Sequence, residues 1–166
     1  MAKHNLGTNS DDADLVIGLG PGFSAGHDVD VVIETMRGHS LGRCIYEGSA
    51  LANTGVPGNV GGYTHERVMH APCAGLFKAI CRIGDRVEAG QTVGYVDDQP
   101  IKANIDGILR GILTSGLMVT EGFKLADVDA RCQEFHCYTI SDKALAIAGG
   151  VMEAISAWEV ENWKGC

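Results

Sequence analysis

Three residues in the last third of the chain have the types that metal sites and reactive thiols require. Cys132, His136 and Cys137 are close together in the sequence. A structural zinc site needs a fourth ligand and usually two residues between its cysteines, and both are missing here. We therefore expect no metal at this position. A reactive thiol at Cys132 or Cys137 and a pair of inert, buried cysteines both remain open.

A glycine-rich loop is the second region with chemical potential. Gly18-Leu-Gly-Pro-Gly follows an apolar strand pattern, and Glu34 lies near the end of the next expected strand, Val29 to Thr35. In a dinucleotide-binding fingerprint the third glycine would fall on Phe23, and Pro21 has no N–H to offer a phosphate. The stretch before Val29 is also too short for the usual parallel crossover. We expect a tight turn or an anion-binding loop, not a complete dinucleotide-binding unit.

Basic side chains follow this loop in the sequence. Arg37, His39 and Arg43 could bind an acidic ligand, with His39 as a proton donor. They could equally form a solvated turn with weak surface ion pairs. The candidate ligand-binding set comprises Gly20, Gly22, Asp28, Glu34, Arg37, His39 and Arg43.

Complete catalytic constellations are not visible in the sequence. His65 and His70 are five residues apart, which places them on different faces of a helix and argues against a zinc-protease motif. The chain has neither a Gly-x-Ser-x-Gly elbow nor a phosphate-binding P-loop. We therefore assign no catalytic residue and expect a binding protein more than an enzyme.

The elements that must position these residues include an internal repeat with an offset of 32 residues. Residues Ala71, Gly75, Ile80, Gly84, Val87, Gly90, Val96 and Asp97 recur as Ala103, Gly107, Ile112, Gly116, Val119, Gly122, Val128 and Asp129. A fixed period of this length indicates a duplicated supersecondary unit. Its glycines leave no room for a helix, so both copies are expected to be β-structure that closes into a small sandwich.

The repeat resembles a biotinyl/lipoyl barrel-sandwich hybrid. The segments that carry the likeness are 71–77, 84–91 and 101–107. In carrier proteins with this fold, a modified lysine lies at the tip of the hairpin between the two halves. Here the tip is Asp97-Asp98-Gln99-Pro100, and Lys102 lies beyond it. The resemblance therefore implies the fold without biotin or lipoate, and the sequence requires no other cofactor.

The predicted architecture is mainly β, or α+β overall. Residues 1–64 form an N-terminal strand and glycine-loop segment, 65–130 the duplicated barrel-sandwich hybrid, and 131–166 a connector and C-terminal helix that packs on the N-terminal segment. Ser141 is placed to cap this helix. The apolar residues expected to face a sheet are Leu145, Ile147, Ala148, Val151, Met152 and Ile155. Gly149-Gly150 weakens the helix or permits a close approach.

Composition narrows the range of partners and compartments. The chain has 166 residues and a formal net charge of −8, without a cluster of Lys or Arg. This charge argues against nucleic acid or an anionic membrane as a partner. We see no membrane-spanning run and no signal-peptide pattern. The six cysteines are therefore expected to be reduced thiols in the cytoplasm.

Longer phrases resemble one bacterial group, the YqeB-type accessory proteins linked to selenium-dependent molybdenum hydroxylases. The phrases are 15–23, 25–26, 28–30, 32–35, 37–39, 41–43, 53–55, 57–58, 66–68, 71–72, Gly75 and 141–146. The resemblance implies a cytoplasmic maturation factor whose partners are the hydroxylase or its other maturation factors. Members typically begin with a nucleotide-binding-like segment, so this chain is expected to correspond to their C-terminal part. The alternatives are a thiol enzyme that handles selenium or sulfur through Cys132 or Cys137, and a structural domain that forms homo-oligomers.

Overall fold

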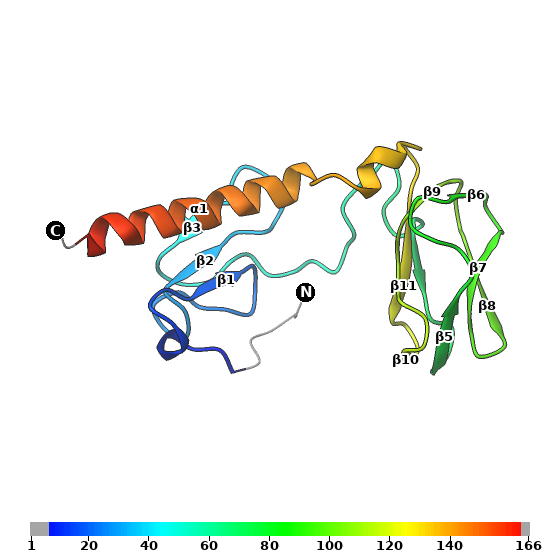
Figure 1. Cartoon of the computed structure of the whole chain (residues 1–166), viewed down its shortest axis with the longest axis horizontal. Coiled ribbons are helices and arrows are strands. Elements are labelled where there is room, and N and C mark those ends of the chain that lie inside the picture. The colour runs from blue at the N-terminus through cyan, green and yellow to red at the C-terminus, as the bar shows by residue number, and fades with distance from the viewer. Residues whose placement is uncertain (1–6, 164–166) are drawn as a thin grey trace. The chain divides into compact units, whose positions relative to one another are not determined.

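The computed structural model describes residues 7–163 and divides the chain into two compact units (Figure 1). Unit 1 comprises Met1–Gly55 and Ile140–Cys166, and unit 2 comprises Val56–Thr139. Cys166 lies outside the described residues. The chain is mainly β with a C-terminal helix, as the sequence predicts. Among residues 7–163, no helix is both long enough and apolar enough to cross a membrane.

Unit 1 contains a three-stranded sheet in the order β1-β2-β3. The strands are β1 (Ile17–Leu19), β2 (Val31–Ile33) and β3 (Cys44–Ile45), preceded by a short 3-10 helix at Ser10–Asp12. The pairing of β1 with β2 is parallel, whereas β2 and β3 are antiparallel. The expectation that the chain between these strands is too short for parallel pairing is therefore wrong. Residues 20–30 cross over as an irregular loop without a helix, which needs less chain than a helical crossover.

The C-terminal helix α1 (Asp142–Asn162) packs on this sheet (Figure 1). The predicted cap is confirmed, because the Ser141 hydroxyl oxygen accepts a hydrogen bond of 3.2 Å from the Ala144 N–H. Ile147, Val151 and the buried Ala154 lie against the core that contains Val31 and Ile33.

The predicted apolar stripe of α1 is only partly correct. Leu145 and Met152 were expected to face the sheet, but they are 64% and 61% exposed. The contacting face is instead centred on small residues. Gly150 is buried, and a Cβ atom there would overlap the carbonyl oxygen of Gly42. The helix can approach the sheet closely only along this glycine, and that approach turns Leu145 and Met152 outward.

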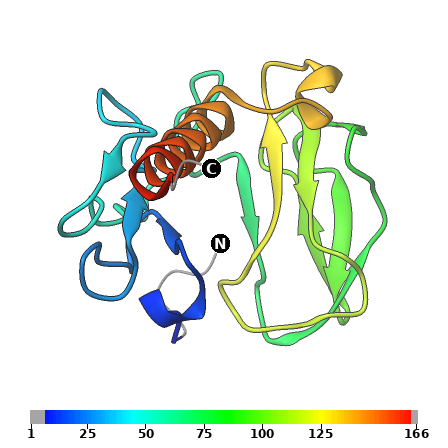
Figure 2. The same cartoon turned by 60° about the vertical axis from the view of Figure 1, so that its left-hand side comes forward.

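Unit 2 contains two four-stranded antiparallel sheets (Figure 2). One has the order β10-β5-β7-β8 and the other β4-β11-β9-β6. The strands are β4 (Val68–His70), β5 (Gly75–Ala79), β6 (Arg86–Val87), β7 (Thr92–Val96), β8 (Gln99–Lys102), β9 (Gly107–Ile112), β10 (Met118–Val119) and β11 (Lys124–Asp129). The strands β5, β6 and β7 begin 32 residues before β9, β10 and β11, respectively.

One apolar core fills unit 2. It includes Phe77 and Val96 from the first sheet and Leu109 and Val128 from the second, all at most 1% exposed. Cys73 and Cys81 pack against this core. The turn between β7 and β8 is Asp97-Asp98, and Lys102 is the last residue of β8, away from that turn. After β11, a short 3-10 helix η2 (Glu134–Cys137) leads toward α1.

Candidate functional site

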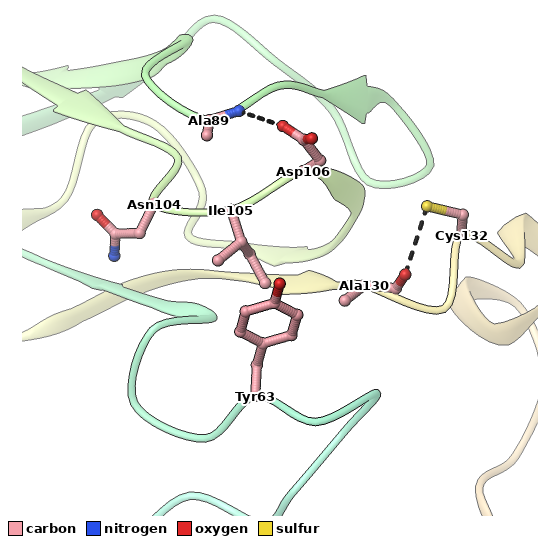
Figure 3. Close-up of a pocket in the computed structure, with 7 residues that line it drawn as sticks. All are labelled: Tyr63, Ala89, Asn104, Ile105, Asp106, Ala130 and Cys132. Carbon is pink, nitrogen blue, oxygen red and sulfur yellow. Dashed lines mark hydrogen bonds between the residues drawn. The ribbon is translucent and has the colours of Figure 1, made fainter.

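An open pocket of about 480 Å³ lies in unit 2 (Figure 3). Its lining residues come from four segments of the chain and are Tyr63, Ala89, Asn104, Ile105, Asp106, Ala130 and Cys132. Most of these residues lie in loops, which leave polar groups accessible at the rim. The pocket therefore offers a phenol, an amide, a carboxylate and a thiol to a small ligand.

The polar side chains of the pocket are partly fixed by the backbone. A carboxylate oxygen of Asp106 accepts a hydrogen bond of 2.7 Å from the Ala89 N–H. The Asn104 side-chain amide donates to the Val68 carbonyl oxygen at 3.4 Å. Figure 3 shows the Tyr63 ring with its hydroxyl turned toward the segment that carries Asn104 and Asp106. These contacts position the groups without using all of their hydrogen-bonding capacity.

Cys132 is exposed at the edge of this pocket and has an unusual backbone conformation. Its φ is +55°, in the left-handed region that residues other than glycine seldom adopt. Its thiol lies 3.5 Å from the carbonyl oxygen of Ala130 (Figure 3), and its N–H donates to the Asp129 carbonyl oxygen at 3.3 Å. The turn therefore presents the Cys132 thiol at the pocket edge.

His136 and Cys137 do not line the pocket with Cys132. The Cys137 thiol is directed to the Leu109 carbonyl oxygen at 3.8 Å, and burial raises its pKa. The nearby Arg110 charge acts in the opposite direction on that pKa. His136 lies against the Phe135 ring, with a centroid distance of 4.4 Å. Among residues 7–163, no three His, Cys, Asp or Glu side chains are grouped to hold a metal ion.

Asp129 is the centre of a buried ionic cluster that the sequence reasoning missed. Its side chain is 1% exposed, and it accepts hydrogen bonds from Arg131 Nε at 2.9 Å and Arg131 Nη2 at 2.6 Å. Arg110 Nη1 and His136 Nδ1 lie 3.6 and 3.5 Å from the same carboxylate. The Arg131 hydrogen bonds lower the Asp129 pKa to about 2, against the opposing effect of burial. The available signal was the recurrence of Asp97 as Asp129 within the repeat.

The glycine loop of unit 1 uses several of its backbone groups internally. Gly20 donates its N–H to the Ile33 carbonyl oxygen at 2.9 Å, and a Cβ atom there would lie 2.5 Å from Thr35 Oγ1. Gly22 is exposed with a φ of +103°. Asp28 accepts a hydrogen bond of 2.5 Å from the Ser24 N–H. Gly20 and Asp28 therefore hold the shape of the crossover, whereas Gly22 is on its surface.

Glu34 is buried and holds two loop segments together. Its side chain is 3% exposed. One carboxylate oxygen accepts from the Met36 N–H at 2.7 Å and the other from the Leu51 N–H at 2.9 Å. Both oxygens are thus engaged by backbone donors, which are typical partners of a buried carboxylate. The sequence could not identify Leu51 as a partner, because it lies seventeen residues away.

Arg37, His39 and Arg43 lie on one exposed loop, between β2 and β3. The two terminal nitrogens of Arg37 contact the two carboxylate oxygens of Asp142, at 2.6 and 3.0 Å. This bidentate pair ties the loop to the first turn of α1. His39 and Arg43 are exposed. The structure therefore places the three basic residues on one exposed loop, whereas Glu34 is buried.

The chain is similar over most of its length to one bacterial protein. It is 49% identical to the uncharacterized protein YqeB of Escherichia coli (strain K12) over 155 residues, and the aligned part covers 93% of this chain. The chain spans 29% of that relative's length. No protein-family model matches the chain. The similarity supports the resemblance to YqeB-type proteins. It does not assign the activity of the whole relative to this chain, which matches less than a third of it.

Three solved structures are partly similar to the chain. A succinylglutamate desuccinylase/aspartoacylase from Rhodobacter sphaeroides is 29% identical, with 38% of this chain and 21% of that protein covered and a TM-score of 0.32. An aspartoacylase family protein from Mesorhizobium loti is 19% identical, with 49% and 27% covered and a TM-score of 0.36. The ectoine utilization protein EutE (DoeB) from Ruegeria pomeroyi is 17% identical, with 51% and 27% covered and a TM-score of 0.36.

Proposed function

We propose that this chain is a binding or assembly module in the maturation of a selenium-dependent molybdenum hydroxylase. The observation that carries the proposal is the likeness to YqeB-type proteins, in long phrases and at 49% identity over 155 residues. The proposed partners are the hydroxylase or its other maturation factors, in the cytoplasm. The fold offers a binding surface and a pocket, which suit a module that docks and holds a ligand.

For unit 2 the proposal includes a duplicated barrel-sandwich hybrid that has no carrier role. The offset of 32 residues between β5, β6 and β7 and their counterparts β9, β10 and β11 supports the duplication. The aspartates at the β7–β8 turn support the absence of a carrier function, because a swinging arm needs a lysine there.

The proposed ligand surface in unit 1 is the loop that carries Arg37, His39 and Arg43. Its exposed cationic groups suit an acidic ligand or an acidic patch of a partner. Gly20, Gly22, Asp28 and Glu34 would support this loop from the crossover and the interior.

The test replaces His39 and Arg43 together by Ala in cells that depend on this factor for hydroxylase activity. We expect hydroxylase activity and its selenium content to fall at least tenfold, with the protein still folded. Lys78→Ala/Lys102→Ala, which removes two exposed cations of unit 2, is the matched control. Full hydroxylase activity in the His39/Arg43 variant would reject this surface.

A thiol function at Cys132 is the second candidate, and one observation favours it. Cys132 is exposed at the pocket, whereas burial raises the pKa of the Cys44, Cys81 and Cys137 thiols and makes them poorer nucleophiles. The structure therefore favours Cys132 over Cys137 as the residue that would handle selenium or sulfur.

Two measurements test the thiol function. Alkylation near neutral pH, followed by mass spectrometry, should label Cys132 first and Cys137 much later. Protein purified without oxygen should contain selenium that Cys132→Ser loses and Cys137→Ser keeps. Slow alkylation at the same rate on both cysteines, together with selenium-free protein, would leave the docking role alone.

A further inference from the structure

The face of α1 that points away from the sheet has three large exposed apolar side chains, and a fourth follows at Trp163, the residue directly after the helix. Leu145, Met152, Val160 and Trp163 are 64%, 61%, 77% and 79% exposed. At about 100° per residue, the four fall within about 80° of one another around the helix axis. The buried Ala154 lies on the opposite side. Exposed apolar groups on one face are unusual for a surface helix and indicate an interaction surface.

The end of the helix strengthens this interpretation. The helix has 21 residues, so it is about 32 Å long, whereas the strands beneath it have only two or three residues each. Residues 159–163 are all exposed, and Figure 1 shows the helix running past the strands of its sheet. A helical end without packing is marginally stable in water. Val160 and Trp163 at this end would gain most from a partner, and Trp is enriched at interface hot spots.

Negative charge borders the apolar face on both sides. Glu153 and Glu159 are exposed and fall on opposite edges of the stripe defined by Met152 and Val160. Glu159 also lies near the negative end of the helix dipole, and the last turn has no basic residue to offset it. Asp142 is different, because it already pairs with Arg37. The unsatisfied charge on this face is therefore anionic.

We propose that this face docks a partner helix whose apolar stripe is bordered by Lys or Arg. Such a helix would cover the four apolar side chains and bring cations to Glu153 and Glu159. The surface lies outside the Arg37–Arg43 loop and the Cys132 pocket, so the inference does not depend on which enzyme the chain serves. In the related YqeB protein, 71% of the length lies outside the part that matches this chain.

A second copy of this chain fits the face poorly. In an antiparallel pair centred on Met152, the two Glu153 carboxylates would lie side by side. In a parallel pair, the edge that carries Glu153 in one copy would face the edge that carries Glu159 in the other. Like charges at such spacing are destabilising. An anionic membrane is disfavoured by the same two carboxylates. The charges on this face therefore favour a basic partner helix over a second copy of the chain and over an anionic membrane.

The test uses two synthetic helical peptides of the same length with the same leucine stripe. One has Lys and the other Glu at the positions that border the stripe. Binding to the full chain is measured by fluorescence anisotropy at low and at physiological salt. We expect the Lys peptide to bind at least tenfold more tightly than the Glu peptide, with the difference shrinking as salt rises.

Three variants locate the binding. Met152→Gln/Val160→Gln should weaken the binding of the Lys peptide at least tenfold. Glu153→Gln/Glu159→Gln should remove most of the difference in affinity between the Lys peptide and the Glu peptide. Met118→Gln, at a methionine of unit 2 that is 74% exposed, is the matched control and should bind the Lys peptide normally. The proposal is overturned if the Lys peptide does not bind, if both peptides bind alike, or if Met118→Gln is equally affected. A stable homodimer in sedimentation equilibrium that Met152→Gln/Val160→Gln dissolves would also overturn it, in favour of a second copy.

Discussion

At the scale of single residues, two buried carboxylates hold the loops of the two units. Asp129 organises the turn after β11 in unit 2, and Glu34 ties the segment after β2 to Leu51 in unit 1. Removing a buried acceptor leaves its donors without partners, which costs more than the net worth of the hydrogen bonds. Both residues therefore allow direct tests of the structure.

Asp129→Asn should lower the free energy of unfolding by about 3 kcal/mol at pH 7, because Arg131 and Arg110 lose a buried counter-ion. The effect depends on pH. The folded-state pKa of about 2 lies below the ordinary value of 3.8, so the contribution is fully present above about pH 4. It is lost as the pH falls through 2. Urea unfolding of both proteins at pH 7, 4 and 2.5 measures this trend.

The control for this comparison is Asp98→Asn, an exposed residue of the β7–β8 turn, which should change stability by less than about 0.5 kcal/mol. An Asp129→Asn deficit that stays constant down to pH 2 would contradict the assignment of the lowered pKa.

Glu34→Ala should lower the free energy of unfolding by about 3 kcal/mol, because the Met36 and Leu51 N–H groups lose their acceptor. Glu34→Gln should cost less, since one side-chain oxygen remains. Urea unfolding measures both values, and Glu47→Ala at an exposed position is the control. Unchanged stability of Glu34→Ala would mean that the carboxylate is free for a ligand.

At the scale of elements, a close approach of two backbones helps to position α1 on its sheet. Gly42 has a φ of +83° and lies against Ala146 and Gly150 of the helix. The Cys44 thiol donates a hydrogen bond of 3.2 Å to the Gly150 carbonyl oxygen on the same side. Helix propensity alone would disfavour both Gly149 and Gly150, but only Gly150 is required by packing.

Gly149→Ala and Gly150→Ala therefore should change stability in opposite directions. Nothing lies within 4 Å of a Cβ atom at Gly149, so Ala there should raise the free energy of unfolding by about 0.5–1 kcal/mol. At Gly150 a Cβ atom would overlap the Gly42 carbonyl oxygen and lie 3.0 Å from Ile33 Cγ2. Ala there should lower stability by about 1–3 kcal/mol. Urea unfolding compares the two, and equal changes would contradict the close contact.

At the scale of the whole molecule, each unit has cores built from its own residues. The two clusters that contain Val32 and Ile33 use only residues of unit 1, and the cluster around Phe77 and Leu109 uses only residues of unit 2. Separate cores favour separate cooperative units that can open independently.

Core truncations should therefore act locally. Ile33→Ala and Leu109→Ala each remove a fully buried side chain, at an expected cost of about 2–5 kcal/mol. In native-state hydrogen exchange, Ile33→Ala should reduce protection in β1 and β2 but not in β9 and β11. Leu109→Ala should do the reverse. Loss of protection in both units from either variant would show a single cooperative unit.

The domain boundaries predicted from the sequence, at 64/65 and 130/131, lie at other positions than the boundaries of these two units. The contacts group residues 56–64 and 131–139 with the strands of unit 2. The charge-bordered face of α1 and the open pocket lie in different units, so ligand binding at Cys132 and docking on α1 can be studied one at a time.

The sequence by itself determined the features that are encoded over a few neighbouring residues. The mainly β class follows from the spacing of glycines and apolar residues. The start of α1 follows from Ser141, whose hydroxyl oxygen accepts a hydrogen bond from the Ala144 N–H. The lack of a lysine at the β7–β8 turn is likewise a local fact. The ligand residues of the glycine loop, the thiol function and the family role remain predictions.

Tertiary structure decided which distant residues meet, because such contacts depend on how whole elements pack. It paired β1 with β2 in parallel, and it turned Leu145 and Met152 outward where helix periodicity alone placed them inward. It also gathered Arg110 and Arg131 on Asp129 and set Cys132, but not Cys137, at the pocket. No local pattern encodes these choices, since a backbone contact such as that of Gly42 with Gly150 forms only when elements far apart in the sequence come together.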